Sequence, residues 1–166
     1  VEDIVVEIHT SDGRIGRGEA PPTAAVTGET LGSIEAALRG HIAPALAGRD
    51  VAGLEDALAA IDRSIVGNSS AKAAAEIAVW DLYSQNCGIP LYKLLGGNRN
   101  TLVTDITISV NAPEVMAKDT ADALARGYET LKIKVGENPA LDLARLKAVR
   151  AAAPDATIRI DANQAW

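Results

Sequence analysis

The first hundred residues change from a two-residue to a helical repeat of apolar positions. Residues 3–10 and 14–20 alternate apolar and polar side chains around a Ser-Asp-Gly turn, which predicts an antiparallel hairpin. After a loop rich in proline, threonine and glycine, apolar residues recur at helical spacing. Helices are expected over 31–46 with a break near Gly40 to Pro44, over 51–65 capped by Asp50, and over 71–87 with a cap offered by 67–70 and an end at Gly88. This half therefore predicts an α+β unit.

The pattern changes near residue 101, where strands and helices begin to alternate. Runs rich in β-branched residues predict strands, and stretches with proline near their start predict helices between them. The strands are expected at 101–110, 130–136 and 156–161, and the helices at 112–128 and 138–155. This order indicates parallel strands joined by right-handed crossovers. The middle strand is then flanked on both sides.

Lys132 and Lys134 lie two positions apart on this middle strand, so both side chains point to one face of the sheet. On an exposed edge strand, such a pair would form a solvated face that discourages aggregation. On a central strand, the two ammonium groups point at something that stabilises them. An open, flavodoxin-like sheet would place them under helices, whereas a sheet that curls into a barrel would turn them toward its interior.

Other polar side chains lie on the neighbouring strands. Asp161 and Asn163 end the third strand, and Thr107 lies on the first. The carboxyl ends of parallel strands meet at one edge, which is where α/β folds place their chemistry. Asp161 offers hard oxygen ligands suited to Mg²⁺. A desolvated lysine has a lowered pKa and can remove a proton from carbon. A base beside a metal ion suggests proton abstraction next to a carboxylate.

Composition and charge narrow the class of protein. The 166 residues carry a net charge of −6 and no long basic run, which argues against a nucleic-acid partner. No apolar stretch reaches the roughly 18 residues of a membrane span, so no membrane partner is expected. The single cysteine, Cys87, allows no internal disulfide and fits a cytoplasmic location. The sequence starts at Val1 within one strand pattern and stops just after another, so we expect both ends to be truncated.

The motifs at the second and third strands resemble those of a known superfamily. Lys-Ile-Lys-Val-Gly (132–136) and Arg-Ile-Asp-Ala-Asn-Gln-Ala-Trp (159–166) look like signatures of the muconate-lactonizing subgroup of the enolase superfamily. Segments 16–30, 67–83 and 104–116 are similar to the dipeptide epimerases of the L-Ala-D/L-Glu group. The resemblance implies a capping domain over 1–100 that lacks its first strand. It implies the first three β/α units of an incomplete, TIM-like (β/α)7β barrel over 101–166.

The resemblance also implies roles for the residues at the strand ends. Lys134 would be a general acid and base at the α-carbon of the substrate. Lys132 would lie beside the substrate carboxylate and keep Lys134 neutral through like-charge repulsion. Asp161 would be the first of three carboxylates that hold Mg²⁺, and Asn163 would lie near the metal and the substrate carboxylate.

Further implied contacts lie outside these strand ends. Thr107 would contact the substrate from the first barrel strand, and the loop around Thr27 and Gly28 would close over the site. The two remaining metal carboxylates and the opposing lysine of the family lie on later strands, which this chain does not contain. The chain alone is therefore predicted to be inactive.

The function implied for the intact parent is that of a Mg²⁺-dependent dipeptide epimerase. Its partner would be a small molecule, a dipeptide or another carboxylate, and the parent is expected to be a homo-oligomer. A muconate cycloisomerase, an o-succinylbenzoate synthase and an N-acylamino acid racemase of the same superfamily stay open as alternatives. An alternative of another class is a non-catalytic α/β module whose lysines bind an anion.

Overall fold

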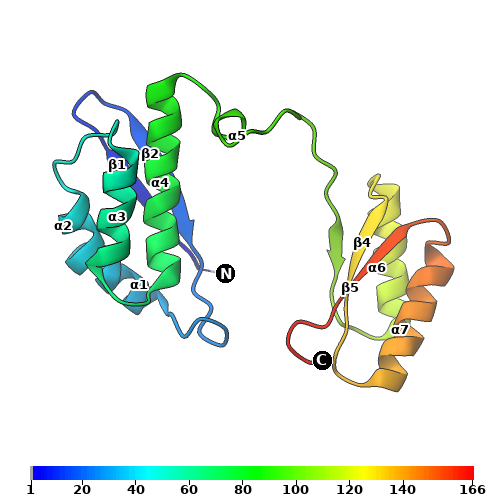
Figure 1. Cartoon of the computed structure of the whole chain (residues 1–166). Helices are drawn as coiled ribbons and strands as arrows, with labels where there is room; N and C mark the ends of the chain where they lie inside the picture. Colours follow the sequence, from blue (N-terminus) through cyan, green and yellow to red (C-terminus); the bar gives the residue numbers. More distant parts are fainter. Residues whose placement is uncertain (1) are drawn as a thin grey trace. The chain divides into compact units, whose positions relative to one another are not determined.

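The computed structural model describes residues 2–166 and divides into two compact units, Val1–Asn98 and Arg99–Trp166 (Figure 1). The first unit begins with an antiparallel hairpin whose strands pair from Ile4 with Ala20 to His9 with Ile15. Its strands are β1 (Ile4–His9) and β2 (Ile15–Ala20), and its helices are α1 (Leu31–Ala37), η1 (Leu38–Ile42), α2 (Ala43–Leu46), α3 (Leu54–Ser64), α4 (Ser69–Cys87) and α5 (Leu91–Leu94). The predicted hairpin and helical half are confirmed.

The predicted break between Gly40 and Pro44 is wrong, because the helix continues through a π-helical turn. The segment η1 spans Leu38–Ile42, and the backbone N–H of Ala43 donates to the carbonyl of Leu38. Pro44 has no N–H to donate, so the ordinary helical hydrogen bond at that position is absent. A wider turn lets the chain pass the proline without leaving the helix.

Helix α4 packs on β2 at very short range. A Cβ on Gly18 would lie 2.0 Å from the carbonyl oxygen of Ala74, and one on Gly16 would lie 2.2 Å from that of Ala78. Glycine on the strand and alanine on the helix therefore allow the two backbones to approach each other. The buried core around this contact contains Ala20, Ile34, Ala37, Ile42, Ala57, Ile61, Ala71, Ala74, Ala75 and Val79.

The first turn of α4 is capped by a residue far away in the sequence. The carboxylate of Glu29 accepts hydrogen bonds from the backbone N–H of Ser70 (3.0 Å) and from the hydroxyls of Ser70 (3.0 Å) and Ser69 (3.1 Å). Burial raises the pKa of Glu29, but the hydrogen bonds from Ser70 and Ser69 outweigh it and leave the pKa below its ordinary value. Asn68, the N-cap residue, makes no capping hydrogen bond with its side chain. The cap predicted within residues 67–70 is thus replaced by Glu29.

The cap predicted for the preceding helix is also wrong. Asp50 accepts a hydrogen bond from the N–H of Ala52 and so closes a turn before the helix. Helix α3 begins three residues later than predicted, with Gly53 at the N-cap position.

The second unit is a parallel three-stranded sheet covered by two helices. The strands are β3 (Ile106–Ile108), β4 (Thr130–Lys134) and β5 (Thr157–Asp161), in the order β3-β4-β5, and the helices are α6 (Pro113–Ala125) and α7 (Pro139–Ala152). Apolar side chains of the strands pack with Met116 and Ala123 of α6 and with Val149 of α7. The predicted strand order and the central place of β4 are confirmed.

Strand β3 is much shorter than the predicted 101–110. Ile106 pairs with Leu131, the second residue of β4. Residues before Asp105 therefore lie beyond the start of β4 and have no neighbouring strand there with which to form a ladder. Across residues 2–166, no helix has the length and apolar character needed to cross a membrane.

We expect Gly18→Ala to destabilise the first unit, because the added methyl group collides with the backbone of Ala74. Overpacking of this kind costs about 1–3 kcal/mol. Gly32→Ala is the matched control: Gly32 lies in helix α1 with open space around its Cβ position. There, the same change should stabilise the fold by about 0.4–1 kcal/mol. Urea unfolding followed by circular dichroism measures both effects, and equal midpoints for Gly18→Ala and the unchanged chain would contradict the close approach.

Candidate functional site at the carboxyl ends of the strands

One face of the second sheet carries a row of charged side chains. The parallel register pairs Thr107 with Lys132, Lys132 with Arg159 and Lys134 with Asp161. Paired residues of neighbouring strands point to the same face, so these five side chains share it. The isoleucine and leucine side chains between them point to the opposite face, where α6 and α7 pack.

Asp161 lies between the two lysines. Its Oδ2 atom is 2.9 Å from Nζ of Lys132 and 2.8 Å from Nζ of Lys134. Lys134 also donates to Oδ1 of Asn163 at 2.7 Å. The second carboxylate oxygen of Asp161 accepts the backbone N–H of Asn163 at 2.7 Å. The structure therefore brings four of the predicted site residues into one hydrogen-bonded group.

The conformation of Asn163 allows this arrangement. Its φ is +51°, in the left-handed region that asparagine tolerates better than most residues. The turn directs the backbone N–H toward Asp161 while the side-chain oxygen reaches Lys134. A β-branched residue at this position would be strained in this conformation.

The electrostatics of the group are dominated by the contacts between Asp161 and the two lysines. The hydrogen bonds from Lys134 and Lys132 hold the pKa of Asp161 well below its usual range. The hydrogen bond and the charge of Asp161 raise the pKa of Lys132. The side chain of Lys132 is 36% exposed, so the carboxylate partner outweighs the loss of hydration. The lowered lysine pKa expected in the interior of a closed barrel stays a prediction. Asp161 also offsets the repulsion between the two ammonium groups.

A second ion pair on this face was missed in the sequence. Nη1 of Arg159 lies 3.1 Å from Oδ2 of Asp105. The pair bridges β5 and the residue before β3, across the central strand. The alternation Arg-Ile-Asp at 159–161 was the available signal, because it places Arg159 and Asp161 on the same face.

The structure places the three remaining predicted site residues in two different units: Thr107 lies in the second unit, and Thr27 and Gly28 lie in the first. Thr107 is the direct neighbour of Lys132 on β3. Thr27 and Gly28 belong to the first unit, in the exposed loop before α1, where the hydroxyl of Thr27 accepts the N–H of Glu29 at 3.3 Å and Gly28 has a φ of +79°. Their closure over the lysines stays a prediction.

The donor atoms at Asp161 and Asn163 suit Mg²⁺ in kind but not in number. Mg²⁺ prefers oxygen ligands in an octahedral arrangement, and a carboxylate and an amide oxygen are of this type. Within residues 2–166, no group of three or more histidine, cysteine, aspartate or glutamate side chains is placed to hold a metal ion. Two donors of this type are fewer than an octahedral Mg²⁺ site needs.

Comparison with known proteins identifies the family. Residues 2–96 match the N-terminal domain of the mandelate racemase and muconate lactonizing enzymes, and residues 115–166 match the enolase C-terminal domain-like family. The chain belongs to the mandelate racemase/muconate lactonizing enzyme family. This confirms the expected superfamily and fold class, an α+β capping domain followed by the start of the barrel domain.

Several relatives within this family are epimerases. The L-Ala-D/L-Glu epimerase of Clostridium acetobutylicum is 53% identical over 167 residues, which cover 100% of this chain and 47% of that enzyme. The substrate-liganded L-Ala-D/L-Glu epimerase structure from Bacillus subtilis has a TM-score of 0.95 and 47% identity, covering 99% of this chain and 46% of that one. The structure of a dipeptide epimerase from Cytophaga hutchinsonii with Mg and D-Ala-L-Val has a TM-score of 0.92 and 37% identity. The match covers 99% of this chain and 45% of that one. The chain spans about half the length of these relatives.

We expect this chain to bind Mg²⁺ only weakly, with a dissociation constant no tighter than roughly 1 mM. A single carboxylate is too little for a tight Mg²⁺ site, and both lysines compete for the same Oδ2 atom of Asp161. Isothermal titration calorimetry with MgCl₂ measures the affinity, and Asp161→Asn serves as the control without the carboxylate charge. Submicromolar binding that Asp161→Asn removes would contradict this ligand count.

Proposed function

We propose that the protein to which this chain belongs is a Mg²⁺-dependent dipeptide epimerase of the L-Ala-D/L-Glu type. It would remove and return the proton next to a carboxylate. One observation carries the proposal: two lysines on the central strand meet Asp161 and Asn163 at the strand ends. Identity of about half over the whole chain to L-Ala-D/L-Glu epimerases supports the choice of substrate.

In this proposal, Lys134 exchanges a proton with the α-carbon of the substrate. Its Nζ lies at the carboxyl end of β4 and is held from two directions, by Asp161 and by Asn163. A held amine reaches the carbon with less reorientation than a mobile one, which lowers the barrier. The side chain is 28% exposed, so a substrate in front of the sheet face can reach it.

Lys132 and Thr107 form the part of the site nearest the substrate carboxylate. They are paired neighbours on β4 and β3. Lys132 lies two residues before Lys134, nearer the amino end of β4. The raised pKa of Lys132 keeps this ammonium charged, as an anion-binding group must be. The loop at Thr27 and Gly28 would contribute to specificity from the capping domain.

The domain assignment is part of the proposal. Residues 1–100 would form the capping domain and residues 101–166 the start of the barrel. Asp161 and Asn163 would hold Mg²⁺ together with carboxylates from the remainder of the protein. When bound, the ion would supply positive charge that stabilises the enolate formed from the substrate.

In the full-length protein, Lys134→Ala should slow α-proton exchange from at least one substrate enantiomer by about 10²–10⁴-fold, the usual contribution of a general acid or base. The measurement is deuterium incorporation at the glutamyl α-carbon of L-Ala-L-Glu in D₂O with Mg²⁺, followed by NMR. Lys147→Ala, on the exposed side of α7, is the matched control and should exchange at the wild-type rate. Wild-type exchange from both enantiomers in Lys134→Ala would refute the assignment.

The present chain alone should show no deuterium incorporation above the buffer control. Within residues 2–166, Lys134 is present without the opposing lysine that the proposed mechanism needs, and no group of three or more histidine, cysteine, aspartate or glutamate side chains is placed to hold a metal ion. Electrostatic stabilisation of the developing charge is often the largest contribution to catalysis, and here most of it is missing. The same NMR experiment with the purified chain is the test. Exchange that Lys134→Ala abolishes would show that this half of the site works by itself.

A further inference from the structure

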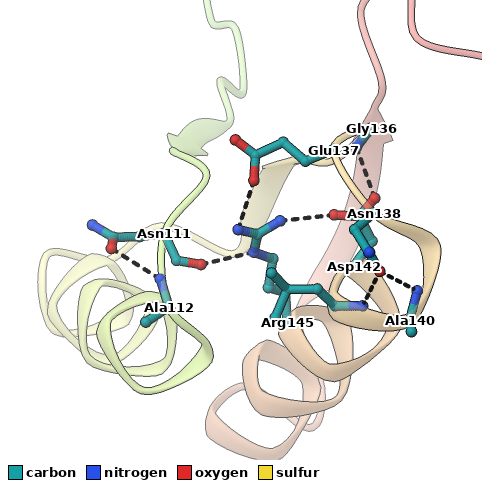
Figure 2. Close-up of polar contacts among 9 residues, drawn as sticks. Asn111, Ala112, Gly136, Glu137, Asn138, Ala140, Asp142 and Arg145 are labelled. Atoms are coloured by element: carbon teal, nitrogen blue, oxygen red, sulfur yellow. Dashed lines mark hydrogen bonds and ion pairs between the residues drawn. The ribbon is translucent and has the colours of Figure 1, made fainter.

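Arg145 connects the two loops that follow the first and second strands of the sheet. This residue of α7 is 4% exposed and donates three hydrogen bonds (Figure 2). Its Nε donates to the backbone oxygen of Asn111 at 2.7 Å, its Nη1 to Asp142 at 3.0 Å and its Nη2 to Glu137 at 2.9 Å. Asn111 follows β3 and Glu137 follows β4, so one guanidinium group joins both strand ends to the helix.

Asp142, the buried partner of Arg145, extends this connection to the backbone behind Lys134. Asp142 is 4% exposed, and its Oδ2 atom accepts the N–H of Gly136 at 2.9 Å (Figure 2). The carboxylate therefore uses one oxygen for Arg145 and the other for the loop two residues after the candidate base. The pair thus contacts the chain directly after the end of β4.

Gly136 in turn contacts the segment after β5. Its φ is +118°, and a Cβ there would lie 2.7 Å from Cβ of Ala165 and 3.1 Å from the carbonyl oxygen of Ala162. One residue earlier, the N–H of Val135 donates to the carbonyl of Asp161 at 3.1 Å. The loop held by Asp142 is thus the surface on which the turn 162–165 rests, and that turn contains Asn163.

We propose that the buried Arg145–Asp142 pair positions the residues of the candidate site at the carboxyl ends of β4 and β5. It holds the loop after β4 against the turn 162–165 and so fixes Lys134 relative to Asp161 and Asn163. Its effect on catalysis rests on the function proposed above, whereas its effect on the turn is a property of this chain.

The chemistry of the pair favours positioning over stability. Two buried charges lose hydration, and apolar residues of similar size often stabilise a fold at least as well. A guanidinium fork offers donors in fixed directions, which suits the joining of three separate segments. Arg145 does not reach Lys134, so its influence passes through the backbone of Val135 and Gly136.

The first experiment uses this chain and measures amide hydrogen exchange by NMR. The double variant Asp142→Leu/Arg145→Met removes the connection without leaving a buried unpaired charge. The amides of Val135 and Asn163 donate to Asp161 and not to either altered residue, so they report on the site itself. We expect their exchange to accelerate by about tenfold or more, while the amide of Ile133 within β4 keeps its protection.

Arg150→Met is the matched control. Arg150 lies on the same helix and also binds three acceptors through Nη1, the carbonyls of Ala153, Pro154 and Ala156. These lie at the opposite edge of the sheet, before β5. Unchanged exchange at Val135 and Asn163 in the double variant, or equal acceleration in Arg150→Met, would overturn the proposal.

The second experiment uses the full-length protein and epimerisation kinetics. Displacing Lys134 should lower kcat by about 10–100-fold, since a misplacement of about 1 Å has effects of this size. KM should change far less, because Arg145 is not placed to touch the substrate. Arg145→Lys keeps the charge but loses the fork and should fall between the wild type and the double variant. A full kcat in the double variant counts against the proposal. If the wild-type protein shows no epimerisation, the proposed function fails, and amide exchange alone decides the role of the pair.

Discussion

The pairing register of β4 and β5 is the constraint on which the candidate site depends. Lys134 is paired with Asp161, and the same register places Lys132 within 2.9 Å of that carboxylate. A slip of β4 by one residue would turn Lys132 and Lys134 to the opposite face and break both ion pairs. It is prevented by the other side of the sheet, where Leu131 and Ile133 are fully buried. The apolar core of this unit thereby sets the geometry of its charged face.

Close backbone packing has the corresponding role in the first unit and explains part of its composition. Helix α4 lies so near β2 that only glycine fits at positions 16 and 18, against the backbone of Ala78 and Ala74. An interface of this kind is filled by small side chains, which accords with a core rich in alanine and a sequence that is only 3% aromatic. The helix is then held at its start by Glu29, which joins the loop before α1 to the same packing unit.

The structural features that could be predicted from the sequence were those that depend on residues close together in the chain. The alternation of apolar and polar residues predicted the hairpin and the shared face of Lys132 and Lys134. The alternation of strands and helices predicted the parallel strand order. Contacts between residues far apart in the sequence could not be predicted in this way. Glu29 lies 41 residues from Ser70, whose N–H it caps. In the sequence, Arg145 and Asp142 resemble an ordinary exposed helical pair. The raised pKa of Lys132 could not be predicted from the sequence either, because it depends on where Asp161 lies, and that position comes from tertiary structure.

The charges on the face of the second sheet indicate which ligands this face can hold. Lys132, Lys134 and Arg159 bring three positive charges, and Asp105 and Asp161 bring two negative ones. Both carboxylates are already paired with these cations, so a divalent ion added here would meet a face with an excess of positive charge. Such an ion is stable only where further anionic oxygens surround it. A Mg²⁺ site that includes Asp161 therefore needs further anionic oxygens beside this face, and the same positive excess suits the face to an anionic group of a ligand.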